Sequence, residues 1–433
     1  MRRTAWRLLA IASLITPAVA ATRPHYGGTL RVQTKARIAA FDPAELSDEA
    51  NLFALVFDRL VSWDESGHPQ PALATSWRHD ADFKRWEFQL RAGVKFHDGS
   101  PFTASAIAEM LKPLVAVAYG EALVIRSEQP APKLLQILAS STISKRAADG
   151  SIVGTGPFRA TVWEPNRRAV FVANEDYWAG RPYADRIEVE MGRSLRDQAL
   201  DLDLNKADIV ELSVGDTRRA MQNGKRTWTS PPVDLLALVF EASSDEHVRE
   251  AVALSIDRAT IHAVLLQKQG IPTGAILPQW LSGYAFLFPA TRDLDRARQL
   301  ARGAAPIVLA YNPADATARL IAERIAVNAH EAGMVIRPVA AGSQVAAARI
   351  LRTRVNWPDL SHALGSVAPW VGLAPPAESS PQAIYAAESA LLRDHRIIPL
   401  FHLPEIYGLG PRVRGWAPSR WGGWKLDSVW LAP

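Results

Sequence analysis

The chain has 433 residues, of which 48% are hydrophobic and 21% are charged, a composition typical of a soluble globular protein with more than one domain. It contains no cysteine, which excludes disulfides, thiol nucleophiles, thiolate metal sites and a lipid-modified cysteine anchor. The formal net charge is only +5, so electrostatics indicates no polyanionic partner and we expect no nucleic-acid binding.

Residues 1–20 have the pattern of a secretory signal peptide. Three arginines within the first seven residues precede an apolar run from Leu8 to Ile15, and Ala18-Val19-Ala20 forms a cleavage site of the A-x-A type. The apolar run is shorter than the roughly 20 residues that a membrane-spanning helix needs. Removing these residues takes away three arginines and no acid, so the net charge falls from +5 to +2. We therefore expect a nearly neutral protein that is free in a periplasm and is not a lipoprotein.

Hydrophobic periodicity predicts a mixture of strands and helices along the mature chain. In chain order, the sequence predicts a strand at 29–34, a helix at 51–60, a strand at 86–91, a helix at 103–111, strands at 158–163, 169–173 and 235–240, a helix at 248–256, a strand at 307–310, a helix at 314–332, and strands at 335–339 and 397–401. Residues 112–150 are expected to form helical pieces broken by prolines, and 357–381 a loop. The strand-helix-strand unit between 307 and 339 indicates an α/β fold with a partly parallel sheet.

The dipeptide His97-Asp98 has two possible readings. A histidine beside an aspartate suits a general base with its orienting acid, but Asp98-Gly99 is also a strong turn signal. No third group that would complete an acid-base unit is evident nearby. We therefore favour a turn that ends the strand at 86–91, and we expect no catalytic residue.

Other motifs that would indicate metal or cofactor chemistry are incomplete. Asp201 and Asp203 form a D-x-D, but no histidine or further acid lies at ligand spacing, so a solvated face is the preferred reading. Gly154-x-Gly156 lacks the third glycine of a dinucleotide loop. The arginines and tryptophans between Arg412 and Trp430 suit nucleic-acid stacking or packing of the last strands, and the low net charge favours packing. We expect no metal and no cofactor.

Eight segments, taken together, resemble one protein family. In order, they are GGTLRV, FDP at Phe41, PALATSW, WEFQLRAGVKFHDGSPFTA, GTGPF, NEDYWAGRPYADRIEV, VREAVALSIDR, and IIPLF with the Trp-rich end. Their order and spacing are similar to those of the extracytoplasmic solute-binding proteins of family 5, which serve ATP-binding-cassette (ABC) importers of peptides, nickel and related solutes. Members that carry the His-Asp pair are binding proteins, which agrees with the turn reading.

The resemblance implies a two-lobe periplasmic-binding-protein fold of the α/β class, with hinged lobes and a subdomain on the first lobe. The implied division is lobe I at 27–50, 150–242 and 396–433, a subdomain at 51–149, and lobe II at 243–395.

The resemblance also implies a function. The chain would be the periplasmic substrate-binding component of an ABC importer, a monomer that captures a peptide or peptide-like solute between its lobes and delivers it to the permease at the inner membrane. The alternative is a ligand sensor or scaffold for a membrane receptor, independent of transport. Two features motivate it: 51–149 and 243–395 are shorter than is usual for the family, and a family acid is missing.

The missing acid concerns the ligand site. Peptide-binding members carry, near 363–377, an acid that pairs with the amino terminus of the peptide, whereas no acid occurs here from Leu360 through Ala377. Asp359 or Glu241 would substitute for it, or would act as a helix cap or a solvated hinge residue. Family clefts gather aromatic side chains, and the candidates here, each of which also suits the core, are Phe41, Phe53, Trp280, Tyr284, Trp357 and Trp370.

Overall fold

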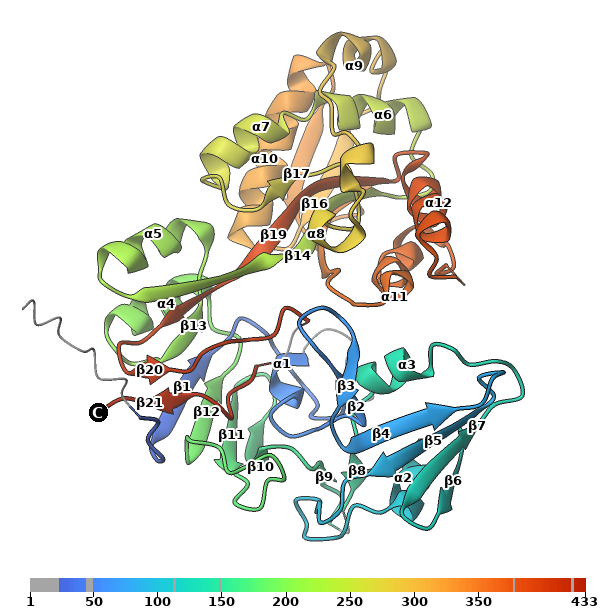
Figure 1. The fold of residues 1–433 in the computed structure, drawn as a ribbon. Helices are drawn as coiled ribbons and strands as arrows, with labels where there is room; N and C mark the ends of the chain where they lie inside the picture. Colours follow the sequence, from blue (N-terminus) through green and yellow to red (C-terminus); the bar gives the residue numbers. More distant parts are fainter. Residues whose placement is uncertain (1–22, 44–49, 112–113, 148, 377, 422–423) are drawn as a thin grey trace, which may run out of the picture.

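The computed structural model describes residues 23–43, 50–111, 114–147, 149–376, 378–421 and 424–433. The expected signal peptide, 1–20, lies outside these residues. Figure 1 shows an upper body and a broader lower body, joined by two long strands that run diagonally between them. The upper body is lobe II, and the lower body contains lobe I and the subdomain. In the part of the chain described, no helix is both long enough and apolar enough to cross a membrane.

The two long strands, β14 (Arg226–Phe240) and β19 (Ile397–Leu409), pair antiparallel and connect the lobes. They belong to one sheet with the strand order β10-β11-β12-β1-β13-β19-β14-β18-β16-β17, so its two ends lie in different lobes. Their register shifts between Thr229 and Asp234, where Pro231 and Pro232 lack the N–H that a regular ladder needs. The crossing of the lobes therefore lies near 230–234.

Lobe I surrounds the lower half of this sheet. Strand β1 is parallel to its neighbours β12 and β13, as the α/β prediction requires. Its elements are β1 (Thr29–Gln33), α1 (Ala50–Phe53), β10 (Phe158–Glu164), β11 (Arg168–Ala173), β12 (Arg186–Glu190), α4 (Leu195–Asp203), β13 (Ile209–Glu211), α5 (Val214–Gln222), β20 (Val413–Arg414) and β21 (Trp430–Leu431).

The subdomain has its own sheet, in the order β4-β5-β7-β6. Its apolar face packs on α2 and α3, with Phe88 and Ile107 fully buried. Its elements are β2 (Val61–Trp63), β3 (Pro69–Pro71), β4 (Ala74–His79), β5 (Arg85–Leu90), α2 (Ala104–Met110), β6 (Val115–Tyr119), β7 (Ala122–Arg126), α3 (Leu134–Ser140), β8 (Lys145–Arg146) and β9 (Ile152–Val153). The side chain of Thr103 accepts a hydrogen bond from the N–H of Ala106 and caps α2, as predicted.

Lobe II contains the expected strand-helix-strand unit, in which β16 and β17 are parallel and α10 connects them. Its elements are α6 (Glu246–Ser255), α7 (Arg258–Thr260), η1 (Ile261–Leu265), β15 (Ile271–Pro272), α8 (Gln279–Ser282), η2 (Ala285–Leu287), α9 (Leu294–Leu300), β16 (Ile307–Tyr311), α10 (Ala316–Glu331), β17 (Ile336–Ala340), β18 (Ala348–Arg354), α11 (Leu360–Gly365), η3 (Ala368–Val371) and α12 (Pro381–Leu392).

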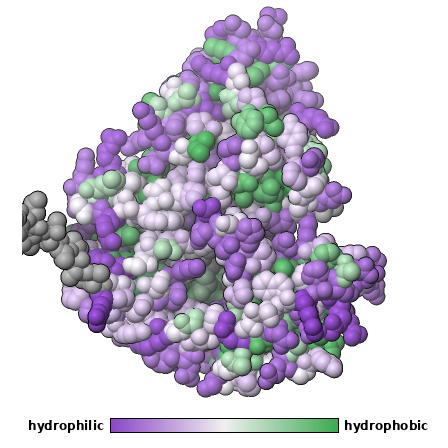
Figure 2. Space-filling view, viewed as in Figure 1, coloured by the Kyte–Doolittle hydropathy of each residue, from purple (hydrophilic) through white to green (hydrophobic). Residues whose placement is uncertain are grey.

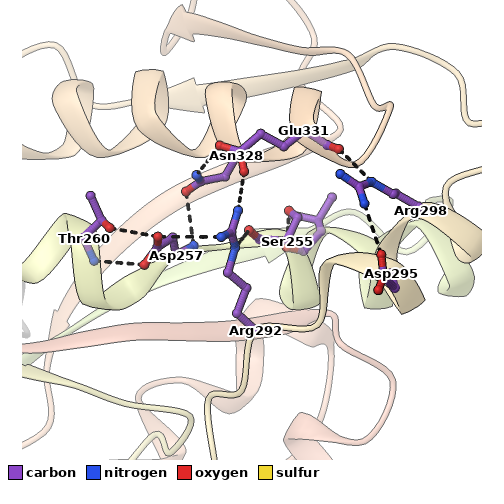
Figure 3. Close-up of polar contacts among 9 residues, drawn as sticks. Ser255, Asp257, Thr260, Arg292, Asp295, Arg298, Asn328 and Glu331 are labelled. Atoms are coloured by element: carbon purple, nitrogen blue, oxygen red, sulfur yellow. Dashed lines mark hydrogen bonds and ion pairs between the residues drawn. The ribbon is translucent and has the colours of Figure 1, made fainter.

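A polar network at the outer end of lobe II joins three of its helices (Figure 3). Asp257 caps α7 by accepting from the N–H of Thr260 at 2.9 Å, and its own N–H donates to the side chain of Asn328 on α10 at 3.1 Å. Arg292 lies between Asp257 and Glu331 and forms an ion pair with each. These contacts fix the start of α7 and the end of α10 relative to each other, so this end of lobe II is braced.

Three expectations about local structure were wrong. Residues 112–150 contain the hairpin of β6 and β7 as well as α3. The edge strand β6 alternates exposed and partly buried side chains, whereas Ala122–Ile125 of β7 are all buried. Residues 357–381 contain α11 and η3 rather than a loop. The predicted helix at 51–60 is only α1 at its start.

The expected division of the chain stays a prediction, and the packing of two segments near its boundaries bears on it. Leu236, Leu238 and Phe240 on β14, with Leu400 and Phe401 on β19, belong to the hydrophobic core of lobe II, although the sequence division places them in lobe I. Residues 52–57 pack in the core of lobe I instead of the subdomain. For the residues of β14 and β19, the cause is that each crossing strand runs through both lobes.

Candidate functional site

Two cavities lie where the lobes meet. The larger, here called the subdomain cavity, has a volume of about 720 Å³ and opens between the subdomain, lobe I and Trp357 of lobe II. The smaller, the hinge cavity, has a volume of about 510 Å³ and is lined by both lobes and by the crossing strands. The space-filling view shows a recess between the upper and lower bodies (Figure 2). Both volumes fall within the range of roughly 300–1,000 Å³ that is usual for small-molecule sites.

Aromatic side chains form much of the wall of the subdomain cavity. They come from α1, the subdomain, the loop after β11, lobe II and the carboxyl-terminal segment. The aromatic lining residues are Phe53, Phe57, Trp63, Tyr177, Trp178, Trp357, Trp421 and Trp424. Hydroxyl groups line another part of the cavity, where Ser140, Ser141, Thr142 and Ser144 follow one another along the end of α3 and the next loop. The cavity therefore offers ring faces and hydrogen-bond donors to a ligand.

The Asp58 carboxylate holds two aromatic side chains of the cavity wall, Tyr177 and Trp178, in place. Trp178 Nε1 donates to it at 2.8 Å, the Thr155 hydroxyl at 2.9 Å and the Tyr177 hydroxyl at 3.1 Å. Burial raises the pKa of Asp58, and the three donors oppose that shift. The guanidinium of Arg91 lies over the ring of Trp178, 4.3 Å from its centroid. Because these contacts hold both rings, this wall of the cavity is preorganised.

Several of the charged side chains that line the hinge cavity pair with one another. Arg352 pairs with Asp234 on β14 at 2.7 Å and with Asp315 at 3.9 Å, and Arg354 pairs with Glu405 on β19. Although burial opposes ionisation, the two arginines lower the pKa of Asp234. These ion pairs connect β18 to β14, β19 and the start of α10.

The subdomain and lobe II are also in direct contact through side chains that do not line the subdomain cavity. Lys133, just before α3, donates from Nζ to the hydroxyl of Ser361 at 3.0 Å and lies 4.0 Å from the Asp359 carboxylate. On another side, the rings of Trp280 and Trp421 lie 5.8 Å apart. Lobe II therefore contacts both the subdomain and the carboxyl-terminal segment of lobe I.

Two of the residues proposed from the sequence line the subdomain cavity: Phe53 and Trp357. Phe41 lies behind this wall, with its ring 5.4 Å from that of Phe53 and 4.7 Å from that of Trp163. Phe41 packs against the core of lobe I and lines neither cavity.

The other aromatic candidates pack within lobe II or at its edge. Trp280 donates from Nε1 to the carbonyl of Pro232 at 2.8 Å. Tyr284 donates its hydroxyl to Glu388 at 2.8 Å, and Trp370 packs on the same apolar cluster as Tyr284. Neither cavity is lined by any of these three. Their role in ligand binding stays a prediction.

The two candidate acids are engaged with protein groups. Asp359 is the N-cap of α11 and accepts from the N–H of Ser361 at 3.0 Å. Glu241 follows the lobe II end of β14 and forms an exposed ion pair with Arg349 at 2.6 Å. Neither lines a cavity. The helix-cap reading of Asp359 is confirmed, and a ligand contact by either acid stays a prediction.

His97 and Asp98 point to different partners. His97 Nε2 donates to the carbonyl of Gly156 at 2.9 Å, and burial lowers its pKa to about 4, so the ring is neutral near pH 7. Asp98 pairs with Lys145 at 2.7 Å. Gly156 is required at this contact, because a Cβ there would lie 2.6 Å from the carbonyl carbon of Val56. The pair joins the subdomain to lobe I as a structural turn and has no geometry for acid-base catalysis.

The remaining candidates from the sequence have structural partners. Asp201 accepts from Arg193 and Gln33, and Asp203 accepts from Arg219 and Asn223. In the described residues, no group of three or more potential metal-binding side chains occurs. Trp424 and Trp430 are buried against lobe I, which agrees with the packing interpretation of the carboxyl-terminal tryptophans.

Sequence reasoning missed several residues of the cavity, including Asp58, Arg59, Trp63 and Trp178. Trp178 lies within the NEDYWAGRP segment, so the motif itself was a signal for it. Arg59 carries no such signal, because a basic residue after an apolar helix usually faces solvent.

Comparison with known proteins identifies the family. Residues 68–336 match the family described as bacterial extracellular solute-binding proteins, family 5 (middle region). The chain belongs to this family. It is 26% identical over 343 residues to the nickel-binding periplasmic protein of Escherichia coli, an alignment that covers 69% of this chain and 64% of that relative. The chain thus spans less than two thirds of the length of that relative.

Solved structures of this family have the same fold. The structure of NikA from Staphylococcus aureus in complex with Ni(L-His)2 is 16% identical, with a TM-score of 0.80, and the match covers 93% of this chain and 99% of that one. A dipeptide-binding protein from Pseudoalteromonas in complex with Met-Leu is 17% identical, with a TM-score of 0.80 and coverage of 93% and 100%. The two-lobe periplasmic-binding-protein fold expected from the sequence is confirmed.

Proposed function

We propose that this protein is the extracytoplasmic substrate-binding component of an ABC importer. It would enclose a peptide or peptide-like solute between its lobes and deliver the closed form to a permease at the inner membrane. The observation that carries the proposal is the subdomain cavity of about 720 Å³, lined by aromatic and hydroxyl side chains where both lobes meet. The names of its relatives support the proposal, because they include nickel-binding, dipeptide-binding and oligopeptide-binding proteins.

The finer parts of the proposal concern location and assembly. We infer export by the signal peptide at 1–20, a periplasmic location without a lipid anchor, and action as a monomer without nucleic acid. The signal pattern, the absence of cysteine and the low net charge support these points. No covalent step is included, since the binding energy would be used to favour the closed arrangement of the lobes.

Within the cavity, we propose that Phe53 and Trp357 contact the solute, together with Trp63 and Trp178. These side chains come from three parts of the fold, so a ligand between them would join lobe II to the lower body. Such a ligand stabilises the closed arrangement because it makes more contacts there than in an open one.

The test is to purify the protein from a periplasm and to identify bound small molecules by mass spectrometry. We expect a short peptide or a related solute, and we expect the same compound to raise the melting temperature of ligand-free protein. Replacing Trp357 by alanine should reduce that rise, whereas replacing the exposed Phe286 of lobe II should not. Flat melting curves across a broad panel of peptides and chelates would contradict the proposal.

A further inference from the structure

A short segment near the carboxyl terminus, residues 419–421, contacts lobe II and the subdomain at the same time. It lies in the red chain between β20 and β21, which runs in Figure 1 from lobe I to the top of β3, beneath lobe II. The segment forms a turn rather than a helix or strand, and its side chains are partly buried. We call this segment the strap.

The strap packs on lobe II through one tryptophan and one buried amide. The ring of Trp421 lies 5.8 Å from that of Trp280 on α8, and the Arg420 guanidinium lies 5.6 Å from the centroid of the same Trp280 ring. The carbonyl of Arg420 accepts a hydrogen bond from the side chain of Asn356, a buried residue shortly before α11. Ring contact, cation–π attraction and a hydrogen bond therefore all join the strap to lobe II.

The other side of the strap is attached to the turn between β2 and β3 of the subdomain. Trp421 Nε1 donates to the carbonyl of Asp64 at 2.6 Å, and Arg420 forms an ion pair with Glu65 at 3.4 Å. Gly67 of the same turn has a positive φ and packs closely, because a Cβ there would lie 3.2 Å from the Trp421 ring. The strap thus stays with the lower body if lobe II moves.

Trp280 also contacts the crossing of the lobes. Its Nε1 donates to the carbonyl of Pro232 at 2.8 Å, and the pairing of β14 with β19 is irregular on both sides of Pro232. An interruption of this kind is where one lobe can rotate on the other. Trp280 therefore lies between the crossing and the strap, so a rotation of lobe II away from the lower body would separate its ring from Trp421.

We propose that the strap is a latch, which holds lobe II against the lower body in the protein without a solute. Opening of the lobes then requires Trp280 to leave Trp421, and the hydrogen bond from Asn356 to break. Trp421 also lines the subdomain cavity, as does Trp357 of lobe II, so a solute in this cavity would lie next to the latch. The latch itself depends only on contacts within the chain, whatever the ligand.

The test is a double-mutant cycle with Trp280→Ala and Trp421→Ala, because each change removes one of the two rings. Spin labels at Glu121→Cys in the subdomain and Gln382→Cys on α12 report the distance between the bodies, in protein freed of bound solute by unfolding and refolding. Each single variant should increase the population with longer distances by about 3- to 10-fold, as expected for the loss of one aromatic pair. The double variant should open far less than the product of the two single effects.

The matched control is Trp77→Ala, which removes a partly buried tryptophan that packs on the subdomain core. It should lower the melting temperature and leave the distances unchanged. A further variant, Trp280→Phe, retains a ring and should stay closer to the wild type than Trp280→Ala does. This comparison decides the matter even if Trp421→Ala does not fold.

Four results would overturn the latch. They are a wild type whose lobes are already apart without solute, unchanged distances in Trp280→Ala, equal opening by Trp280→Phe and Trp280→Ala, and single effects that multiply in the double variant. Failure of the wild type to bind any solute is a different outcome, because it contradicts the proposed function and leaves these distances as they are.

Discussion

The carboxyl group of Glu388 on α12 is fully buried within lobe II. The N–H groups of Ile276 and Leu277 donate to it at 2.5 and 3.0 Å, and the Tyr284 hydroxyl donates at 2.8 Å. It therefore ties the segment around α8 to α12. Burial raises the pKa of Glu388 to about 7, although the three donors favour the ionised form.

This raised pKa predicts a pH dependence of stability. The folded protein retains the proton up to about pH 7, whereas the unfolded chain loses it near the ordinary value for glutamate, about 4.5. The free energy of unfolding should therefore fall as pH rises from about 4.5 to 7, by roughly 2–3 kcal/mol from this group. Glu388→Gln should remove that slope while retaining an acceptor for the N–H donors.

Urea unfolding at pH 5 and pH 7.5 measures the effect. Relative to the wild type, Glu388→Gln should be less stable or equal at pH 5 and should gain at pH 7.5. The exposed Glu323→Gln on α10 is the control and should show no such change. A constant difference between Glu388→Gln and the wild type at both pH values would contradict the prediction.

At the scale of elements, the side-chain contact between the starts of α3 and α11 is a polar link between the subdomain and lobe II. Lys133 and Asp359 are only partly covered, so their pairing contributes roughly 0.2–1 kcal/mol. Lys133→Met should shift the lobes toward an open arrangement by up to about fivefold in population. The global stability should change little, because neither core loses packing.

Spin labels provide the measurement, because the chain contains no cysteine and two introduced thiols would be the only ones. Labels at Glu121→Cys in the subdomain and Gln382→Cys on α12 occupy exposed positions in the two bodies. The distance distribution should broaden toward longer values in Lys133→Met and stay unchanged in Lys84→Met, an exposed control in the subdomain. Identical distributions in all three proteins would show that this contact does not hold the lobes together.

Elements with strong local signals were predictable from the sequence. The strand at 235–240 and the strand-helix-strand unit from 307 to 339 were placed correctly, because the pattern of apolar residues in each segment indicates which positions are buried. The hairpin of β6 and β7 was missed, because prolines on either side suggested broken helices. The first part of β14 and the last part of β19, beyond the predicted 235–240 and 397–401, were not predicted, since nothing local marks a strand that passes from one lobe to the other.

The candidate site was less predictable than the fold. Phe53 and Trp357 are about three hundred residues apart, and only the tertiary fold brings both to one cavity. Aromatic residues such as Phe41 and Trp370 have the same local signature but pack into cores. Asp359 was a candidate for contacting the solute, but its side chain caps the amino terminus of α11.

At the scale of the whole molecule, the lobes share one sheet through two crossing strands and touch again around the subdomain cavity. We expect relative motion of the lobes to concentrate at the register shift of the crossing strands near 230–234, where the regular pairing of β14 and β19 is interrupted. Closing the lobes would complete the walls around a solute, and opening them would release it.

The most direct measurement of this account is a crystal structure of the protein purified from a periplasm with its natural ligand. We predict electron density for a small solute in the subdomain cavity, between Phe53, Trp178 and Trp357. Density in the hinge cavity instead, or an empty subdomain cavity in protein that mass spectrometry shows to carry a ligand, would contradict it.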